Sequence, residues 1–259
     1  MTEREAKAKA LKSMEMADAL YLSLWYPNLR LAGLADKLAA VLGEFARHGG
    51  EARVYAATVW PVSWQEAPVL QRVWGRVVAP AAPGEMPVVG AEPRAAVEET
   101  LELLHEDYAY EFQIGWSLWE LEGAALGNGA GVDTRTTAGL ETGGTRLETG
   151  GTGDGRWARV SRLVRVTGYG PLFDEGAFEQ EGHIRIDFGA DTPFLEEEAE
   201  LDGTAARHMA ENVRQLVDLT AAVEKASGAT ARLLWSELGE SLAQRLAQRL
   251  AELPGGQRN

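Results

Sequence analysis

The stretch Asp107–Leu121, DYAYEFQIGWSLWEL, constrains the fold more than any other part of this chain. Large apolar residues stand at every second position from Tyr108 to Leu118, namely Tyr108, Tyr110, Phe112, Ile114, Trp116 and Leu118. Because side chains alternate between the two faces of a strand, this pattern predicts a long strand with one buried, aromatic face. We expect Trp116 to be buried. Trp119 breaks the alternation and is expected on the polar face.

The residues before and within this strand predict an α+β unit over residues 15–122. Three further segments show strand patterns: Ala19–Tyr26, Arg53–Val62 and a shorter one near Val73–Val78. Apolar residues at helical spacing predict a helix over Leu31–Phe45, and Pro93 fits the first turn of a second helix. The resulting order, strand, helix, strand, strand, helix and strand, is that of a ferredoxin-like sandwich, an antiparallel sheet with two helices on one face.

Residues 123–156 differ in composition from the rest of the chain. Glycine and threonine dominate, and the heptad LETGGTR at 140–146 is followed by LETGGTG at 147–153. Such repeats lack the large apolar residues that a packed core needs, so we expect a flexible insertion. No GxxxxGK[ST] motif occurs, and no GxGxxG motif lies between a strand and a helix, so these glycines do not predict a phosphate loop.

The remaining residues, 157–254, predict a second α+β unit. Strand patterns occur at Trp157–Val166 and His183–Phe188, and a helical stripe occupies Thr204–Ala226. The segment Ala231–Trp235 fits either a last short strand or the start of the terminal helix, which is expected at Gly239–Leu253. This unit either continues the first sheet or is a diverged copy of the first unit. Both alternatives give the same fold class: α+β, with antiparallel sheet or sheets and helices mainly on one face.

Composition narrows the functional classes. The 39 acidic residues exceed the 25 basic ones, for a formal net charge of −14, which disfavours binding to nucleic acid or to anionic membranes. The chain has no cysteine, so disulfides, thiol nucleophiles and cysteine zinc sites are excluded. The charged N-terminal residues contain no apolar core of a signal peptide, and nowhere do 18 apolar residues run together. A cytoplasmic protein is therefore expected.

Two places carry polar side chains that can serve a binding or catalytic site. His183, Arg185 and Asp187 share one face of a predicted strand, where side chains two residues apart stand about 7 Å from each other. Arg185 can pair with a carboxylate or phosphate and His183 can move protons, although alternating charge is also typical of a solvated strand face. His105 stands with two acidic residues just before the anchor strand, which suits either an acid–base group or a polar helix end.

The remaining signals favour binding over catalysis. Among eight tryptophans, Trp64 and Trp119 are the ones expected at an exposed interface. No GxSxG, HExxH or kinase signature occurs, and no acidic cluster has the spacing of a calcium loop, so no catalytic residue, cofactor or metal site is predicted. We expect a non-enzymatic, cytoplasmic protein-binding or assembly module with a protein partner. The alternative is an enzyme or small-molecule sensor with a polar pocket around His183, Arg185 and Asp187, joined by His105.

Overall fold

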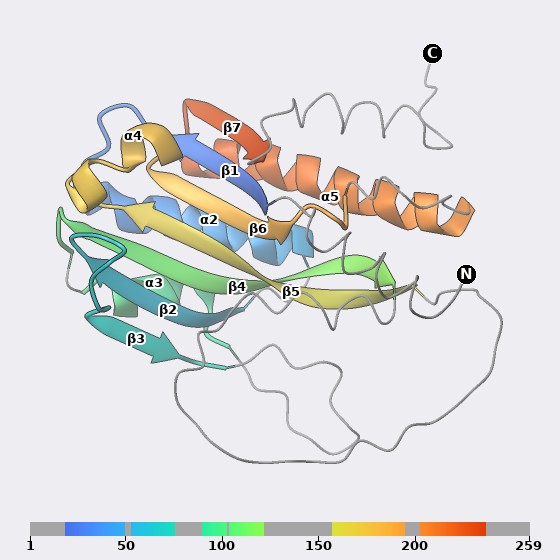
Figure 1. The fold of residues 1–259 in the computed structure, drawn as a ribbon, viewed down its shortest axis with the longest axis horizontal. Helices are drawn as coiled ribbons and strands as arrows, with labels where there is room; N and C mark the ends of the chain where they lie inside the picture. The colour runs from blue at the N-terminus through green and yellow to red at the C-terminus, as the bar shows by residue number, and fades with distance from the viewer. Residues whose placement is uncertain are drawn as a thin grey trace.

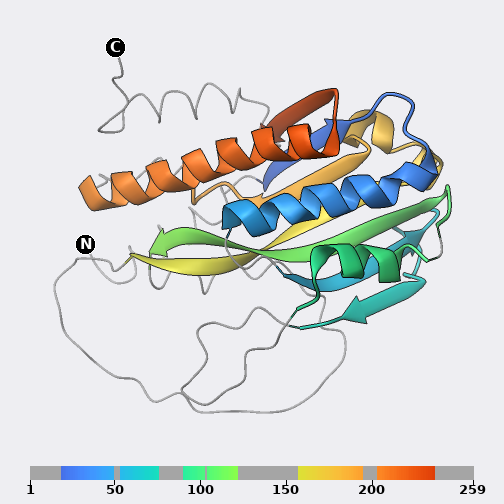
Figure 2. The same cartoon turned by 180° about the vertical axis from the view of Figure 1, so that it is seen from behind.

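In the computed structural model, a single sheet of seven strands in the order β3-β2-β4-β5-β6-β1-β7 joins residues from both ends of the chain (Figure 1). The structure describes residues 19–49, 53–75, 90–102, 104–121, 157–194 and 203–236. Every strand pair is antiparallel. The three longer helices of the described part cover the same face of the sheet (Figure 2). The α+β fold class with helices mainly on one face is therefore confirmed.

The elements follow the chain in the predicted order. The strands are β1 (Ala19–Trp25), β2 (Val54–Pro61), β3 (Leu70–Val73), β4 (Tyr108–Leu121), β5 (Trp157–Tyr169), β6 (Ile184–Ala190) and β7 (Ala231–Ser236). The longer helices are α2 (Leu34–Gly49), α3 (Pro93–Thr100) and α5 (Gly203–Ser227). Short helical turns are η1 (Leu31–Gly33), η3 (Phe173–Glu175) and α4 (Phe178–Glu181).

The strand β4 lies in the middle of the sheet and carries much of the core. Its alternating apolar residues from Tyr110 to Leu118 are buried, and Trp116 keeps only 1% of its surface exposed. The Trp116 ring lies 6.1 Å from the ring of Phe45 on α2 and 5.3 Å from that of Phe188 on β6. Every residue from Ala109 to Leu121 pairs with β5. The buried apolar residues at alternate positions from Tyr110 to Leu118 confirm the predicted periodicity.

The helices α2 and α5 pack side by side on this apolar face (Figure 2). Their buried residues follow helical spacing: Leu34, Leu38, Val41, Leu42 and Phe45 on α2, and Val213, Leu216, Leu219 and Val223 on α5. Gly168 of β5 lets α2 approach the sheet closely, because a Cβ atom there would lie 2.9 Å from Leu38 Cδ1. The helix α3 begins at Pro93, and the Glu92 side chain accepts a hydrogen bond from the Ala95 N–H at 3.0 Å.

The structure shows that the segment beginning at Ala231, which the sequence left open as a strand or the start of a helix, is a strand. Ala231–Ser236 is a strand, β7, and β1 lies between β6 and β7. Strands of both predicted α+β units therefore belong to one sheet. The short strand β3 begins at Leu70, earlier than the predicted segment near Val73–Val78, of which residues 76–78 lie outside the described residues. The predicted insertion 123–156 and the predicted helix Gly239–Leu253 also lie outside them. Across the described part of the chain, no helix combines the length and hydropathy needed to cross a bilayer.

Candidate functional site

Two of the predicted site residues, Arg185 and Asp187, take part in a network of charged side chains on the sheet face opposite the helices. Asp187 accepts two hydrogen bonds from Arg165 of β5, from Nε at 3.1 Å and from Nη2 at 2.5 Å. Its other carboxylate oxygen accepts the Gly189 N–H at 2.8 Å. Asp187 is buried, with 7% of its surface exposed. Because both of its oxygens are occupied, Asp187 fixes Arg165 and the end of β6.

Arg185 belongs to a second part of this network. Its guanidinium forms an ion pair with Glu181, and the Tyr169 hydroxyl donates to the same Glu181 oxygen at 2.5 Å. The Arg185 guanidinium also lies 5.6 Å from the ring of Tyr21 and 5.8 Å from that of Tyr169. Burial raises the pKa of the Tyr169 phenol, so the hydroxyl remains a donor. Arg185 is thus held between two aromatic rings and one carboxylate.

Glu111 of β4 is a member of the network that the sequence did not single out. Burial raises the pKa of its carboxyl, Arg165 lowers it in opposition, and Asp187 raises it further. Glu111 and Asp187 are therefore two acidic groups near Arg165, and Arg185 also lowers the pKa of Glu111. The sequence gives one signal that Glu111 belongs to the network: it is a carboxylate placed between two aromatic residues of a long strand.

The structure places the two predicted histidines outside this network. His183 Nδ1 accepts the Tyr26 N–H at 3.2 Å, and its ring lies 4.8 Å from that of Phe178. Burial lowers the pKa of His183, which favours the neutral ring that this hydrogen bond requires. His105 stacks on Tyr108 with a ring separation of 4.5 Å. Within the described residues, no hydrogen bond, ion pair or ring contact joins either histidine to Arg185 or Asp187.

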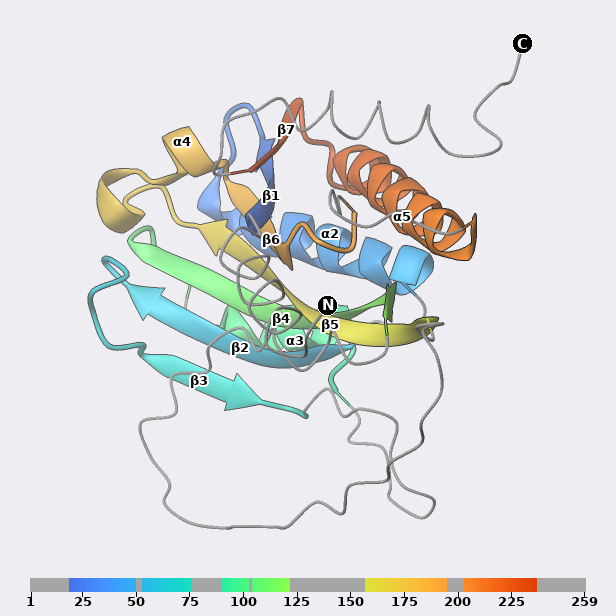
Figure 3. The ribbon, with the colours of Figure 1, turned by 45° about the vertical axis from the view of Figure 1, so that its right-hand side comes forward.

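One end of the sheet forms a compact set of loops that we call the apex, made of residues 62–69, 104–107 and 170–177 (Figure 3). Backbone hydrogen bonds tie the loops together. The Val62 N–H donates to Asp107 O, the Asp174 N–H to Val62 O, and the Leu172 N–H to Glu106 O, each at 2.7 Å. Because the bonds run between loops, each loop holds the other two in place.

The apex backbone is strained at three residues that are not glycine. Val62, Asp174 and Glu175 have φ angles of 58°, 46° and 56°. A left-handed conformation costs an L-residue roughly 1–2 kcal/mol, and a β-branched residue such as valine is rare there. Gly170 is required for another reason, because a Cβ atom at this position would lie 2.4 Å from Glu106 O. The bonds between the loops hold this conformation against its strain.

The apex carries exposed apolar side chains and an aromatic cluster. Val62 is 53% exposed and Leu172 is 62% exposed. In the cluster, Trp64 packs edge-to-face against Phe173, with ring centroids 5.0 Å apart, and against Tyr169 at 6.1 Å. Trp64 is therefore a half-buried support of the apex.

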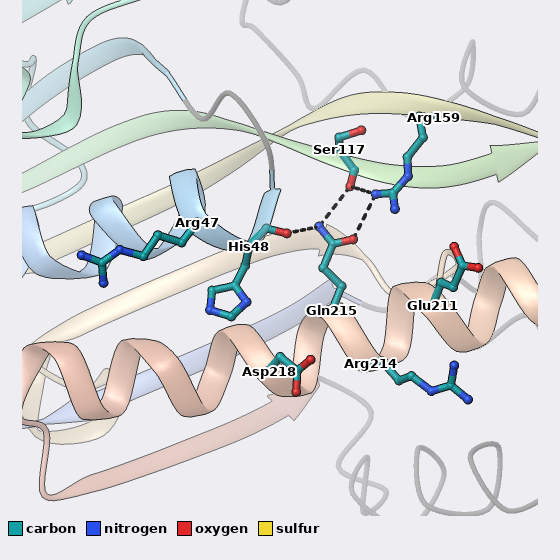
Figure 4. Close-up of a pocket in the computed structure, with 8 residues that line it drawn as sticks. All are labelled: Arg47, His48, Ser117, Arg159, Glu211, Arg214, Gln215 and Asp218. Atoms are coloured by element: carbon teal, nitrogen blue, oxygen red, sulfur yellow. Dashed lines mark hydrogen bonds between the residues drawn. The ribbon is translucent and has the colours of Figure 1, made fainter. Parts of the chain in front are cut away.

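A second feature is a pocket of about 630 Å³ between the end of α2, the middle of α5 and the β4–β5 pair (Figure 4). It is lined by Arg47, His48, Ser117, Arg159, Glu211, Arg214, Gln215 and Asp218. Gln215 donates to His48 O at 2.8 Å and to Ser117 O at 3.2 Å, and accepts from Arg159 at 3.1 Å. The sequence did not indicate this pocket, because its residues come from four separate elements and share no motif.

Trp119, the second predicted interface residue, lies beside this pocket and is half-buried. Its ring stacks on His208 of α5 with centroids 4.0 Å apart, and its Nε1 donates to Glu211 at 2.7 Å. Its backbone N–H donates to Asn212 Oδ1 at 2.9 Å. Trp119 breaks the alternation of β4 at the point where the strand meets α5, and it joins the two elements.

No protein-family model matches the chain, and neither the curated proteins nor the solved structures contain a match to it.

Proposed function

We propose that this chain is a non-enzymatic protein-binding module and that the apex docks on a basic surface of a partner protein. The observation that carries the proposal is the exposure of three apolar side chains, Val62, Val69 and Leu172, on loops whose backbone is fixed by hydrogen bonds. Apolar residues on a rigid support lose little conformational entropy on binding, so more of their contact free energy remains as affinity.

Charge around the apex supports a basic partner. The apex contains the acidic residues Glu66, Glu106, Asp107, Asp174 and Glu175. No lysine or arginine occurs in residues 62–69, 104–107 or 170–177. Apolar side chains surrounded by charge of one sign resemble the arrangement of a protein interface, in which an apolar centre is enclosed by a polar rim. The rim then selects a partner surface rich in lysine or arginine.

The alternative function, an enzyme or sensor centred on His183, Arg185 and Asp187, has less support. Asp187 is occupied by Arg165 and Gly189, and Arg185 is occupied by Glu181. His183 uses Nδ1 for the Tyr26 backbone. Side chains already bound to one another must break these contacts before they can bind a ligand, which lowers the affinity available to it.

The test is capture of partners by the immobilised full chain from a lysate of cells that express it, quantified by mass spectrometry. The apex variants are Val62→Asn and Leu172→Asn, each of which removes an exposed apolar side chain. The control variants are Val73→Asn on β3 and Leu233→Asn on β7, which remove apolar side chains of 70% and 52% exposure elsewhere on the sheet.

We expect proteins that are captured by the wild type and by both control variants and are lost from both apex variants. Raising the salt concentration should elute them, because screening weakens attraction between opposite surface charges. Equal capture by wild type and apex variants contradicts the proposal, and so does the absence of any reproducible partner.

A further inference from the structure

We propose that the pocket between α2, α5 and the β4–β5 pair binds a small molecule that carries a phosphate or carboxylate group together with a hydroxyl or amino group. The volume of about 630 Å³ lies in the range of small-molecule sites. This site is separate from the apex. Ser117 lies nine residues along β4 from Tyr108, a distance of about 30 Å in an extended strand.

Hydrogen bonds within the protein hold the polar side chain at the centre of the pocket in place. The Gln215 amide bonds to the backbone carbonyls of His48 and Ser117 and to the Arg159 side chain (Figure 4). These contacts join α2, α5, β4 and β5 at one side chain. A ligand that enters therefore meets a prearranged polar surface and loses little free energy in ordering it.

Arg159 is the group best placed to bind an anion. Its Nη1 donates to Ser117 O at 3.0 Å and to Gln215, and its guanidinium lies 5.1 Å from the Trp119 ring. Within the described residues, no hydrogen bond occupies its Nε or Nη2. A guanidinium held against an aromatic ring with one edge unoccupied can donate two parallel hydrogen bonds to a phosphate or carboxylate.

Arg214 adds a second positive charge to the lining of the pocket. It is exposed, and no ion pair or hydrogen bond within the described part of the chain engages it. Figure 4 shows Arg214 and Arg47 extending to opposite sides of Gln215. Arg47 is paired with Glu44 on its own helix. Arg214 and Arg159 are therefore two lining arginines without an ion pair among the described residues, and their charges favour an anionic ligand.

The acidic residues of the pocket determine the rest of the ligand. Glu211 uses one carboxylate oxygen for Trp119 Nε1. Asp218 is exposed, and no hydrogen bond or ion pair within the described residues engages it. Figure 4 places it on the α5 side of the pocket, below Gln215. A carboxylate near a guanidinium disfavours a ligand that is anionic throughout. It favours one that presents a hydroxyl or ammonium group beside its anionic group.

The test is isothermal titration calorimetry of the full chain with four probes: inorganic phosphate, citrate, glucosamine 6-phosphate and glucosamine. We expect glucosamine 6-phosphate to bind more tightly than inorganic phosphate, and glucosamine without the phosphate not to bind. Citrate, which has carboxylates and a hydroxyl but no phosphate, distinguishes the two anionic groups. Failure of both citrate and glucosamine 6-phosphate to bind at millimolar concentration overturns the proposal.

Variants locate the binding. Arg159→Gln should weaken it by about tenfold or more, the loss of a charge-assisted hydrogen bond. Arg214→Gln should weaken it by about threefold to tenfold through charge alone, and it removes no contact of the described fold. The matched control is Arg207→Gln, an exposed arginine on the same helix that does not line the pocket. Unchanged affinity in Arg159→Gln, or equal losses in Arg214→Gln and Arg207→Gln, overturns the assignment.

Discussion

The N–H of Asp174 donates to the carbonyl of Val62 at 2.7 Å, and both residues hold positive φ angles, 46° and 58°. One hydrogen bond therefore joins two strained positions that come from loops more than a hundred residues apart in the chain. Strain of this kind persists only where the surrounding structure holds it, and it is common at binding sites. The strain can be tested separately from binding.

Val62→Asn should stabilise the chain by about 1 kcal/mol, because asparagine adopts the left-handed conformation more readily than valine. The free energy of unfolding is measured by urea denaturation. Val73→Asn, at an exposed strand position with ordinary φ, should leave stability unchanged or slightly lower. A loss of stability in Val62→Asn would contradict the strain at this residue. A gain would show that lost partner capture in this variant is not caused by unfolding.

Gly170→Ala should destabilise the chain by about 2 kcal/mol or more, because the new Cβ atom would lie 2.4 Å from Glu106 O, a backbone atom that cannot turn away. The control is Gly43→Ala within α2, where a Cβ atom has no heavy atom within 4 Å. That variant should gain about 0.5–1 kcal/mol, since alanine favours a helix over glycine. Thermal and urea unfolding measure both changes. Equal effects of the two variants would show that loops 104–107 and 170–177 do not need their close approach.

Glu111 should lower the free energy of unfolding as pH rises from its ordinary pKa to its raised pKa in the folded state. The folded carboxyl binds its proton more tightly than the unfolded one, so the unfolded state loses its proton first as pH increases. We expect Glu111→Gln to be more stable than wild type at neutral pH. This advantage should shrink as pH falls toward the ordinary pKa of a glutamate carboxyl, about 4.3, because the unfolded state then begins to bind the proton too. Unfolding free energies measured between pH 4 and pH 8 test this, with Glu102→Gln, an exposed carboxylate, as the control.

His183 should act in the opposite direction. Burial lowers its pKa in the folded state, so below the ordinary histidine value of about 6.5 the unfolded state binds the proton more readily. Wild-type stability should therefore fall between pH 7 and pH 5. In His183→Asn the side-chain oxygen can still accept the Tyr26 N–H, but it does not titrate. This part of the pH dependence should be absent in the variant, and an unchanged slope would mean that protonation of His183 is not coupled to folding.

The sequence was sufficient for the elements of the sheet and insufficient for its sites. Periodicity located β4 and the burial of Trp116, because one face of that strand is in the core from Tyr110 to Leu118. Periodicity did not predict that Trp64 packs inside the apex. The alternating pattern ends with β2 at Pro61, and the positive φ of Val62 then changes the direction of the backbone. Arg159 and Gln215 meet only through the packing of α5 on β4 and β5, and no local pattern records such a meeting. His105 and His183 resembled site residues because both are histidines next to other polar residues. The sequence alone does not show which side chains they contact in the folded protein.

The position of β1 in the sheet has a consequence for folding during synthesis. Trp235 of β7 donates a hydrogen bond to Ser23 of β1, although 212 residues separate them. The other neighbour of β1 is β6. While the chain is being synthesised, β2, β3 and β4 can already pair with one another, whereas β1 has no partner strand. Its backbone N–H and C=O groups have no strand to pair with until β6, in the last third of the chain, has emerged. Completion of the sheet is therefore a late event on the ribosome, and a chain truncated before β6 is expected to aggregate through its first strand.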